Sequence, residues 1–329
     1  MYDFVRKFRR VNFYARGVTR DLIPYAIYER LLRRLYERIE SDGLPDRIID
    51  RVNYYNKIAA GAGLRSAMPA RKVEGKLGGF SYYYYDLKQY LNYFNPDLLI
   101  HYQFGDFDGV LGEPGIVKCR PIAGDNANSI LMKLNKLRNF GLSRTDDPAN
   151  FRDKIDAAVW RGGRTHHPLR NALLRRHNNH PRHNIGHVAA EFESIKPKPS
   201  LTPREQLRYR YVISIEGADV ATNLKWILPS QSLCLMPRPR AEAWFMEGRL
   251  EAGEHYVELR DDFADLDDKV DYYDRHEAEA RAIIANANRH ALSFADSASE
   301  DLISILVLQK YFERTGQLAP EPFSARVLR

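Results

Sequence analysis

Two aspartates, Asp106 and Asp108, stand one residue apart in "IHYQFGDFDG", directly after a short apolar stretch. Carboxylates at this spacing can hold a divalent cation through their oxygen atoms. Alternatively, one carboxylate can act as a general base that removes a proton from a reacting hydroxyl group, while the other lies in a turn. The pair by itself leaves both chemistries open.

A second segment whose residues could take part in chemistry, "RGGRTHHPLR", follows the apolar stretch "AAVW". Gly162 and Gly163 allow the backbone to turn sharply and to approach a ligand closely. Arg161 and Arg164 can form charge-assisted hydrogen bonds with phosphate oxygens. The loop would suit a nucleoside diphosphate, although an ordinary tight turn with solvated or acid-paired arginines would have the same sequence.

The stretch "YVISIEGADVATNLKWILPS" predicts another strand-to-helix junction, with Gly217 at the turn. The helix is expected to begin near Asp219 and to carry Thr222, Asn223 and Lys225 in its first turns. Free N–H groups at a helix start, with a lysine nearby, bind phosphate. Asp219 as an ordinary N-cap is the alternative. Both junctions would lie at the carboxyl ends of strands in one sheet, where α/β sheets bind ligands.

Other chemistry has less support in the sequence. His166 and His167 are adjacent, and "HNNHPRH" lacks the HExxH spacing, so no metal site is predicted. Neither GxGxxG nor GxxxxGK[ST] occurs, which disfavours dehydrogenases and P-loop kinases. Cys119 and Cys234 lack CxxC spacing and are interpreted as reduced thiols.

From residue 156 onward, apolar stretches alternate with polar or helical segments: "AAVW", "HNIGHV", "YVISIEG", "SLCLMP" and "HYVEL". This alternation predicts a parallel sheet of strand–helix units, and therefore an α/β fold with a Rossmann-type domain. Upstream, "DLLIHYQFG" predicts a buried strand, and "DNANSILMKLNKLRNF" a helix capped by Asp125 or Asn126. The cluster of Tyr82 to Tyr85 with Tyr90 fits either a core or stacking on sugar rings.

The chain of 329 residues is long enough for two domains. The boundary is expected near residues 148–156, around "DPANFRDKID", which separates residues 1–152 from 153–300. The remaining residues, 301–329, predict a C-terminal helix that could pack back on the N-terminal domain. A hydrophobic fraction of 44% and a charged fraction of 28% are typical of a globular enzyme.

A net charge of +7 favours anionic partners. The segment "DLIPYAIYERLLRRLYERIE" predicts a basic amphipathic helix, with Ile23, Ile27, Leu31, Leu32 and Leu35 at helical spacing and Arg30, Arg33, Arg34 and Arg38 beside them. Such a helix could pack on its own domain or attach to an anionic membrane leaflet. The N-terminus lacks the apolar region of a signal peptide, and no run approaches the roughly 20 apolar residues of a membrane span. A cytoplasmic protein, peripheral at the inner membrane if this helix attaches, is expected.

Several stretches, in their order and spacing, together resemble glycosyltransferase family 90: "VWRGGRTHHPLR", "YVISIEGADVATNLKWILPSQSLCLMPRP", "AWFMEGRL" and "HYVELRDDFADL". That family contains protein O-glucosyltransferases, fungal capsule xylosyltransferases and bacterial lipopolysaccharide-modifying transferases. Upstream, "IHYQFGD" and "GIVKCRPIAGDNANSILMKLNKLRNF" resemble the bacterial branch, so that the likeness covers Tyr82 to Tyr311.

The resemblance implies a GT-B architecture, in which two Rossmann-like domains face each other across a cleft. The domain of residues 1–152 would bind the acceptor, and that of residues 153–300 the UDP-sugar. The implied reaction is an inverting, metal-independent transfer of xylose or glucose to a hydroxyl of a lipopolysaccharide or another cell-surface glycan. The UDP-sugar is then a co-substrate, and no other cofactor, metal or nucleic acid is expected.

The family's functional residues map onto this chain by motif. Asp106 matches the general base, which implies a turn or acceptor-side position for Asp108. The diphosphate loop maps to Arg161, Gly162, Gly163, Arg164 and Thr165, and the second donor motif to the stretch from Gly217 through Asp219, Thr222 and Asn223 to Lys225. Eukaryotic members have an arginine in place of Asn223, so the phosphate charge should fall on Arg164, Lys225 and the helix start.

Two other interpretations are kept open. A metal-dependent GT-A-like transferase would use Asp106 and Asp108 as its DxD ligands, but the long parallel-sheet half argues against that fold. A non-catalytic, basic nucleic-acid-binding or adaptor protein would account for the positive charge, but no recognised nucleic-acid motif supports it.

Overall fold

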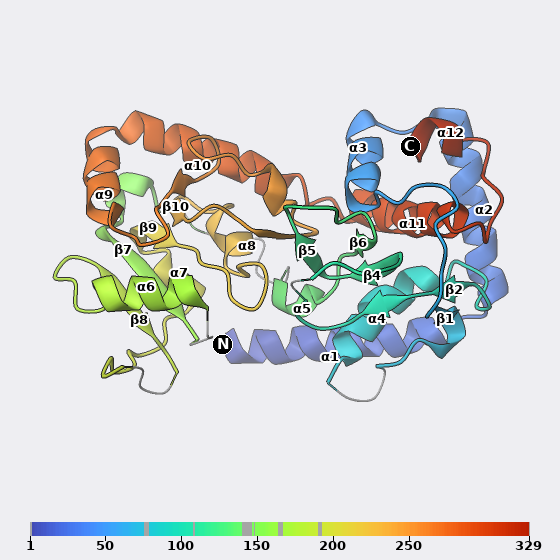
Figure 1. Cartoon of the computed structure of the whole chain (residues 1–329), viewed down its shortest axis with the longest axis horizontal. Helices are drawn as coiled ribbons and strands as arrows, with labels where there is room; N and C mark the ends of the chain where they lie inside the picture. The colour runs from blue at the N-terminus through green and yellow to red at the C-terminus, as the bar shows by residue number, and fades with distance from the viewer. Residues whose placement is uncertain are drawn as a thin grey trace. The chain divides into compact units, whose positions relative to one another are not determined.

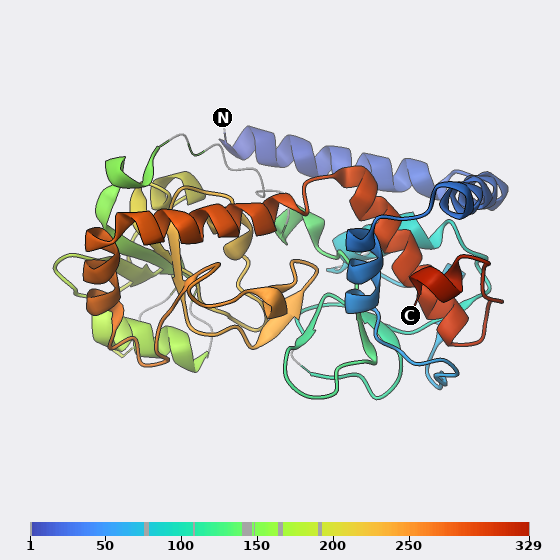
Figure 2. The same cartoon turned by 90° about the horizontal axis from the view of Figure 1, so that it is seen from above.

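A computed structural model describes residues 2–75, 79–107, 109–139, 147, 149–163, 167–189 and 193–328, without the side chains of residues 2–6, 138 and 139 (Figures 1 and 2). The chain forms two compact units. Unit 1 comprises Met1–Leu137 and Asp296–Arg329, and unit 2 comprises Arg138–Ala295. The division therefore falls at residues 137 and 295, whereas the sequence suggested boundaries at 152 and 300.

Unit 2 is built on a parallel five-stranded sheet with the order β12-β10-β9-β7-β8 (Figure 1). Its strands are β7 (Ile155–Gly162), β8 (Asn184–His187), β9 (Tyr209–Ile213), β10 (Leu233–Met236) and β12 (Val257–Glu258). Each strand lies in one of the five apolar stretches recognised in the sequence. The prediction of an α/β fold with a parallel sheet is therefore confirmed.

Helices cover this sheet, which explains why most residues of its strands are buried. The helices are α6 (Pro168–His177), α7 (Pro203–Gln206), α8 (Leu224–Ile227), α9 (Leu266–Arg275) and α10 (Glu277–Leu292). Unit 2 also contains a short buried strand, β11 (Ala241–Ala243), and 3-10 turns at Phe151–Asp153 and Glu247–Arg249. Trp160 and Tyr211 of the sheet share one core with Leu173 of α6 and Ile284 of α10. Strands covered on both faces need no polar alternation.

Unit 1 contains a smaller parallel sheet with the order β3-β4-β6. Its strands are β3 (Tyr102–Gln103), β4 (Gly115–Val117) and β6 (Ser129–Leu131), and β1 (Met68–Pro69), β2 (Leu99–Ile100) and β5 (Cys119–Pro121) complete the strands of this unit. The helix predicted from Asp125 or Asn126 is therefore wrong. The residues from Ser129 to Leu131 are fully buried and pair with β4, and the short helix α5 (Lys136–Asn139) begins only after Asn135, whose φ is 57°.

The helices of unit 1 are α1 (Tyr2–Asp21), α2 (Tyr25–Asp42), α3 (Asp46–Tyr55), α4 (Ser81–Leu91), α11 (Ser297–Arg314) and α12 (Ser324–Val327), with a 3-10 turn at Ala70–Lys72. The C-terminal helix α11 packs against α3 and α4. Tyr83, Tyr84, Tyr85 and Tyr90 of α4 are buried, so this cluster forms core rather than a sugar platform. Within the part of the chain that is described, no helix combines the length and the apolar character that a membrane crossing requires.

A buried ionic network joins three segments of unit 1. Glu300, on α11, accepts from Arg51 Nη1 at 2.5 Å and from Lys133 Nζ at 2.7 Å, and Arg51 also donates to Tyr55 Oη at 2.9 Å. Burial opposes ionisation of the Glu300 carboxyl, but the two cations outweigh it and lower its pKa. The network fixes α11 to α3 and to the segment that follows β6.

Glu300→Gln is expected to lower the free energy of unfolding by about 3–5 kcal/mol, because two buried cations lose their anionic partner. Urea unfolding followed by circular dichroism measures the change. Glu37→Gln, at an exposed position of α2, is the control and should stay within about 0.5 kcal/mol of the parent protein. A loss below about 1 kcal/mol for Glu300→Gln would mean that the network contributes no more than a surface ion pair.

Candidate active site

The loops after β7 and β9 lie at the topological switch point of the unit 2 sheet. From β7 the chain continues to β8 on one side, and from β9 it continues to β10 and β12 on the other. In open parallel sheets, the carboxyl ends of the two strands at such a point border the crevice where ligands bind. The two junctions singled out in the sequence are thus neighbours at this edge.

Arg170, in the first turn of α6, joins the two loops through hydrogen bonds to backbone carbonyl groups. Its Nη1 donates to Gly163 O at 2.9 Å, in the loop after β7. Its Nε and Nη2 donate to Glu216 O at 2.9 Å and Ile215 O at 3.2 Å, in the loop after β9. The guanidinium carbon lies 5.9 Å from the centre of the Trp160 ring. Arg170 therefore sets the spacing of the two loops.

The three glycines of these loops have different roles. A Cβ atom at Gly162 would lie 2.5 Å from Cζ2 of Trp160, and one at Gly217 would lie 2.8 Å from Nη2 of Arg170. Both positions are therefore too crowded for a side chain. Among the described atoms, none lies within 4 Å of a Cβ at Gly163, so this glycine leaves the loop open on that side.

Arg161 points away from the position expected of a phosphate ligand. Its Nη1 donates to Asn184 O at 2.8 Å and to Trp160 O at 3.0 Å, its Nη2 to Asn184 Oδ1 at 2.7 Å, and its Nε to Pro199 O at 3.0 Å. The guanidinium thus holds β8 and the segment near Pro199 in place. Arg164 and Thr165, the other predicted phosphate contacts, lie outside the described residues.

The second junction differs from its predicted form. Its helix, α8, begins at Leu224 and has a single turn, whereas the sequence predicted a start near Asp219. The Asn223 side chain accepts from Ser214 Oγ at 2.7 Å and donates to Ile213 O at 3.1 Å. The prediction of a helix start at Asp219 is therefore wrong, because these side-chain bonds hold the segment as a loop at the end of β9.

The remaining residues predicted for this loop are only partly accessible. Gly217 and Thr222 are half-buried, Asp219 is buried, and Gly217 N donates to Asp219 O at 3.0 Å. Gly217 and Thr222 are thus more accessible to a donor than Asp219.

Lys225 is committed to a buried ion pair. Its Nζ lies 2.5 Å from Glu247 Oε1, and each of the two side chains is 1% exposed. Glu247 Oε2 accepts a further hydrogen bond from Ala243 N at 2.7 Å. A contact between Lys225 and a phosphate stays a prediction, and it would require this pair to open.

Two arginines that were not predicted lie at the same sheet edge, directly after β10. Arg238 is exposed, with Nε 3.6 Å from Glu258 Oε2, and Arg240 Nη2 lies 2.5 Å from Asp261 Oδ2. Exposed ion pairs of this kind contribute little stability, so phosphate oxygens can replace their carboxylates at small cost. The sequence signal was present in "PRPR", which follows the strand "SLCLM".

A small pocket lies among the loop after β9, the segment after β10 and the start of α6, and Arg238 is one of its lining residues. Its lining includes Leu169, Ser214, Glu216, Ala221, Met236 and Arg238. Burial raises the pKa of the Glu216 carboxyl, whose Oε1 accepts from Arg240 N at 2.9 Å and Ala241 N at 3.0 Å. Beside it, burial and then the neighbouring Arg170 and Arg240 lower the pKa of His167, which keeps this imidazole neutral.

Asp106 lies at the corresponding edge of the unit 1 sheet. It comes three residues after β3, and Lys118 directly follows the neighbouring parallel strand β4. Lys118 Nζ donates to Asp106 Oδ1 at 2.5 Å, and the side chains of the two residues are 3% and 41% exposed respectively. A buried ammonium thus orients a partly exposed carboxylate, which suits a group that accepts a proton from a bound hydroxyl. Asp108 lies outside the described residues.

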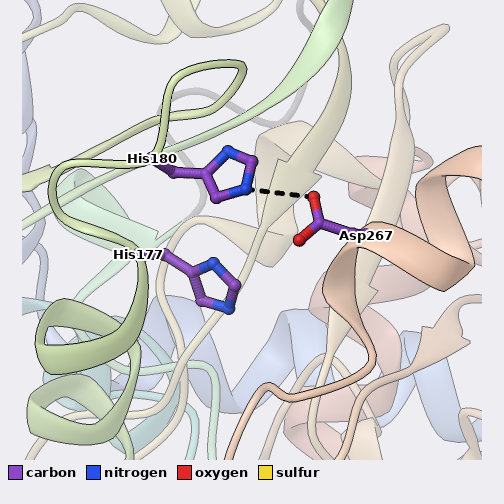
Figure 3. Close-up of side chains that lie close together, drawn as sticks. All are labelled: His177, His180 and Asp267. Carbon is purple, nitrogen blue, oxygen red and sulfur yellow. Dashed lines mark ion pairs between the residues drawn. The ribbon is translucent and has the colours of Figure 1, made fainter.

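Three side chains of unit 2 come together in a way that the sequence did not indicate (Figure 3). His177, His180 and Asp267 each have a nitrogen or oxygen atom within 4.8 Å of the others. These are residue types that bind Zn²⁺ at about 2.0–2.2 Å. The group lies at the last turn of α6, and the loop after β7 lies before its first turn. Ten helical residues, about 15 Å, separate the two.

Hydrogen bonds within the protein occupy most of these atoms. His180 Nδ1 accepts from Arg182 N at 3.2 Å, so Nε2 carries the proton, and Nε2 lies 3.2 Å from Asp267 Oδ1. His183 Nε2 reaches the same oxygen at 3.0 Å, and His177 Nε2 lies 2.8 Å from Phe263 O. A metal ion would have to replace the protons that link His180 and His183 to Asp267. We therefore interpret the group as a hydrogen-bonded connection between α6 and α9.

The chain matches one family profile and is similar to two individual proteins. The profile described as "Glycosyl transferase family 90" matches residues 127–311, which include both loops at the switch point. A protein of Dichelobacter nodosus named "O-glucosyltransferase LpsA" is 40% identical over 311 residues, 93% of this chain and 96% of that protein. The "Uncharacterized protein 035R" of Invertebrate iridescent virus 3 is 29% identical over 150 residues, 38% of this chain and 13% of the viral protein. The similarity to LpsA extends over nearly the whole of both proteins.

Proposed function

Since the chain belongs to glycosyl transferase family 90, we propose that it moves a glucosyl or xylosyl residue from a UDP-sugar to a hydroxyl group of a lipopolysaccharide or another cell-surface glycan. Family membership makes the chain a glycosyltransferase, and this argues against a non-catalytic nucleic-acid-binding or adaptor protein. Glucose ranks before xylose because the relative of nearly equal length is named an O-glucosyltransferase.

Unit 2 is proposed to hold the donor. The observation that carries this proposal is the Arg170 connection, which unites the loops after β7 and β9 at the switch point of a parallel sheet. Arg238 and Arg240 lie at the same edge, and they can offset the negative charge of a diphosphate. We therefore assign the diphosphate to this edge, with Gly163 as the point of closest backbone approach.

Unit 1 is proposed to hold the acceptor, with Asp106 as the general base. The acceptor oxygen attacks the anomeric carbon, and Asp106 takes the proton from that hydroxyl. As the new glycosidic bond forms, the bond from the anomeric carbon to the phosphate oxygen breaks, and UDP leaves with the electron pair. A single displacement of this kind inverts the anomeric centre. With the donor assigned to one unit and the acceptor to the other, we propose the GT-B fold that the family resemblance implies.

We further propose that the transfer needs no metal ion. The support is that arginines at the donor edge can stabilise the charge that develops on the leaving diphosphate. The rival interpretation, a DxD metal site at Asp106 and Asp108, would place the metal in unit 1 and would compete with Lys118 for the Asp106 carboxylate.

The reaction is also proposed to take place in the cytoplasm, at the inner membrane, on a lipid-linked glycan.

A donor screen tests the proposal directly. The full chain is incubated separately with UDP-glucose, UDP-xylose, UDP-galactose and GDP-mannose, and released nucleotide is measured with and without EDTA. UDP-glucose is expected to give the fastest release, and EDTA to leave the rate unchanged. Loss of activity in EDTA that Mn²⁺ restores would favour the metal-dependent rival, and the absence of turnover or thermal stabilisation with every UDP-sugar would reject the proposed donor.

A further inference from the structure

Helix α1 has two apolar sides, and only one of them packs on the protein. On the inner side, Phe13 and Tyr14 contact the ring of Tyr85 on α4 with centroid distances of 6.4 and 5.8 Å, and a Cβ at Gly17 would overlap that ring. The outer side carries an apolar stripe at spacings of three and four residues, formed by Phe8, Val11, Ala15, Val18 and Leu22. Phe8, Val11 and Leu22 are 65%, 66% and 76% exposed. The outer stripe thus faces solvent.

The stripe continues through the corner between α1 and α2. All six residues of "LIPYAI", from Leu22 to Ile27, are exposed, and Leu31 extends the row one turn further along α2. Eight of the fifteen large hydrophobic side chains that are exposed in the described chain lie between Phe8 and Leu31. Figures 1 and 2 show the chain turning sharply at this corner, with α2 leading away from the end of α1. Exposed apolar surface concentrated in this way marks an interaction site.

The same segment is rich in positive charge. Helices α1 and α2 together hold ten Lys and Arg and six Asp and Glu. On α2, the inner side buries Tyr28, Leu32 and Ile39. Arg30, Arg34 and Arg38 are exposed on the outer side, beside Ile27 and Leu31. The two helices therefore contribute +4 of the net charge of +7.

We propose that α1 and the outer side of α2 bind the surface of a bilayer that contains anionic lipids. An interfacial helix buries a narrow apolar stripe at the level of the headgroups, while its arginines contact lipid phosphates. The stripe from Phe8 to Leu22 is about 21 Å long at 1.5 Å per residue, and it would lie parallel to the membrane plane. The proposal revises the sequence-based prediction in that α1, rather than α2 alone, supplies most of the apolar contact.

Two other occupants fit this surface less well. A second copy of the chain would bring two positively charged segments, each of net charge +4, against each other, which opposes association. A nucleic acid would pair with the arginines but would leave the apolar stripe in water. A membrane satisfies both features at once. Lipid binding is independent of the transferase reaction, and only its link to a lipid-carried acceptor rests on the proposed function.

Co-sedimentation of the full chain with vesicles tests the proposal without any sugar donor. Vesicles of phosphatidylcholine alone are compared with vesicles of phosphatidylcholine and phosphatidylglycerol, at low and high salt. Binding is expected with the anionic vesicles and should weaken as salt screens the charges. The variant Val11→Ser/Leu22→Ser should bind at least about tenfold more weakly. Arg30→Gln/Arg34→Gln should lose about fivefold per arginine.

Matched substitutions outside the two helices serve as controls. Val110→Ser/Leu292→Ser changes exposed apolar residues, and Arg204→Gln/Arg275→Gln changes exposed arginines. Both controls should bind vesicles as the parent protein does, and all variants should keep its circular dichroism spectrum. Equal binding to both vesicle types, or unchanged binding of the helix variants, would overturn the proposal. A dimer in light scattering that Val11→Ser/Leu22→Ser converts to a monomer would assign the surface to a second copy instead.

Discussion

Asp106→Asn is expected to reduce the rate of sugar transfer by about 10²–10⁴-fold, the usual contribution of a general base. The amide keeps the size of the side chain but cannot take the proton of the acceptor hydroxyl. Because Asp106 belongs to unit 1 and the proposed donor edge to unit 2, the dissociation constant of UDP should stay unchanged. Initial rates of transfer and UDP titration calorimetry provide the two readouts.

The contact with Lys118 offers a second, distinguishable test of the same assignment. Lys118→Met removes the ammonium that orients Asp106 Oδ1, so kcat should fall by less than in Asp106→Asn, with the KM for the donor unchanged. Asp42→Asn, at an exposed position of unit 1, is the control and should have parental rates. Full activity of Asp106→Asn would remove Asp106 from the reaction, whatever the donor proves to be.

Arg170→Lys is expected to lower kcat/KM for the donor by about 10²-fold, the loss that a displacement of about 1 Å can produce in a positioned site. A lysine keeps the charge, but its single ammonium cannot bridge Gly163, Ile215 and Glu216 in the way that the guanidinium does. The effect should appear as weaker UDP binding, with a smaller change in the rate at saturating donor.

Arg175→Lys is the matched control for Arg170→Lys, because it lies on the same helix and pairs with Glu193 at the surface. Its effect on kcat/KM should be within twofold. If Arg170→Lys and Arg175→Lys change kcat/KM for the donor equally, the hydrogen bonds of Arg170 to the two loops do not position the donor. If Arg170→Lys instead lowers only the unfolding temperature, Arg170 has a structural role alone.

The parallel sheet of unit 2 could be predicted because each of its strands lies in a mainly apolar stretch and polar or helical segments separate these stretches. The same reasoning failed between Asn126 and Asn139. Burial of Ile130, Leu131 and Met132 on all sides produces an apolar run that fits a helix as well as a strand. Only the pairing with β4, which involves residues about fourteen positions earlier, decides between them.

The candidate site was predicted less evenly than the fold. The positions of the glycine loops and of Asp106 at the ends of strands could be predicted because these residues follow apolar stretches directly. The contacts of Arg161 and Lys225 could not, because their partners Asn184 and Glu247 lie more than twenty residues away. No role was predicted for Arg170 from the sequence. Pro168, a residue typical of the first helical turn, does indicate that Arg170 lies at the start of α6.

The buried pair of Lys225 and Glu247 bears on how mutational data for this family should be read. Replacing a cation that is buried beside its counter-ion leaves the anion unpaired in the interior, so a Lys225 variant is expected to lose activity through misfolding even if Lys225 never contacts the donor. A scan scored by activity alone would not distinguish this loss from the loss of a phosphate contact. Soluble yield, measured in parallel, separates the two causes.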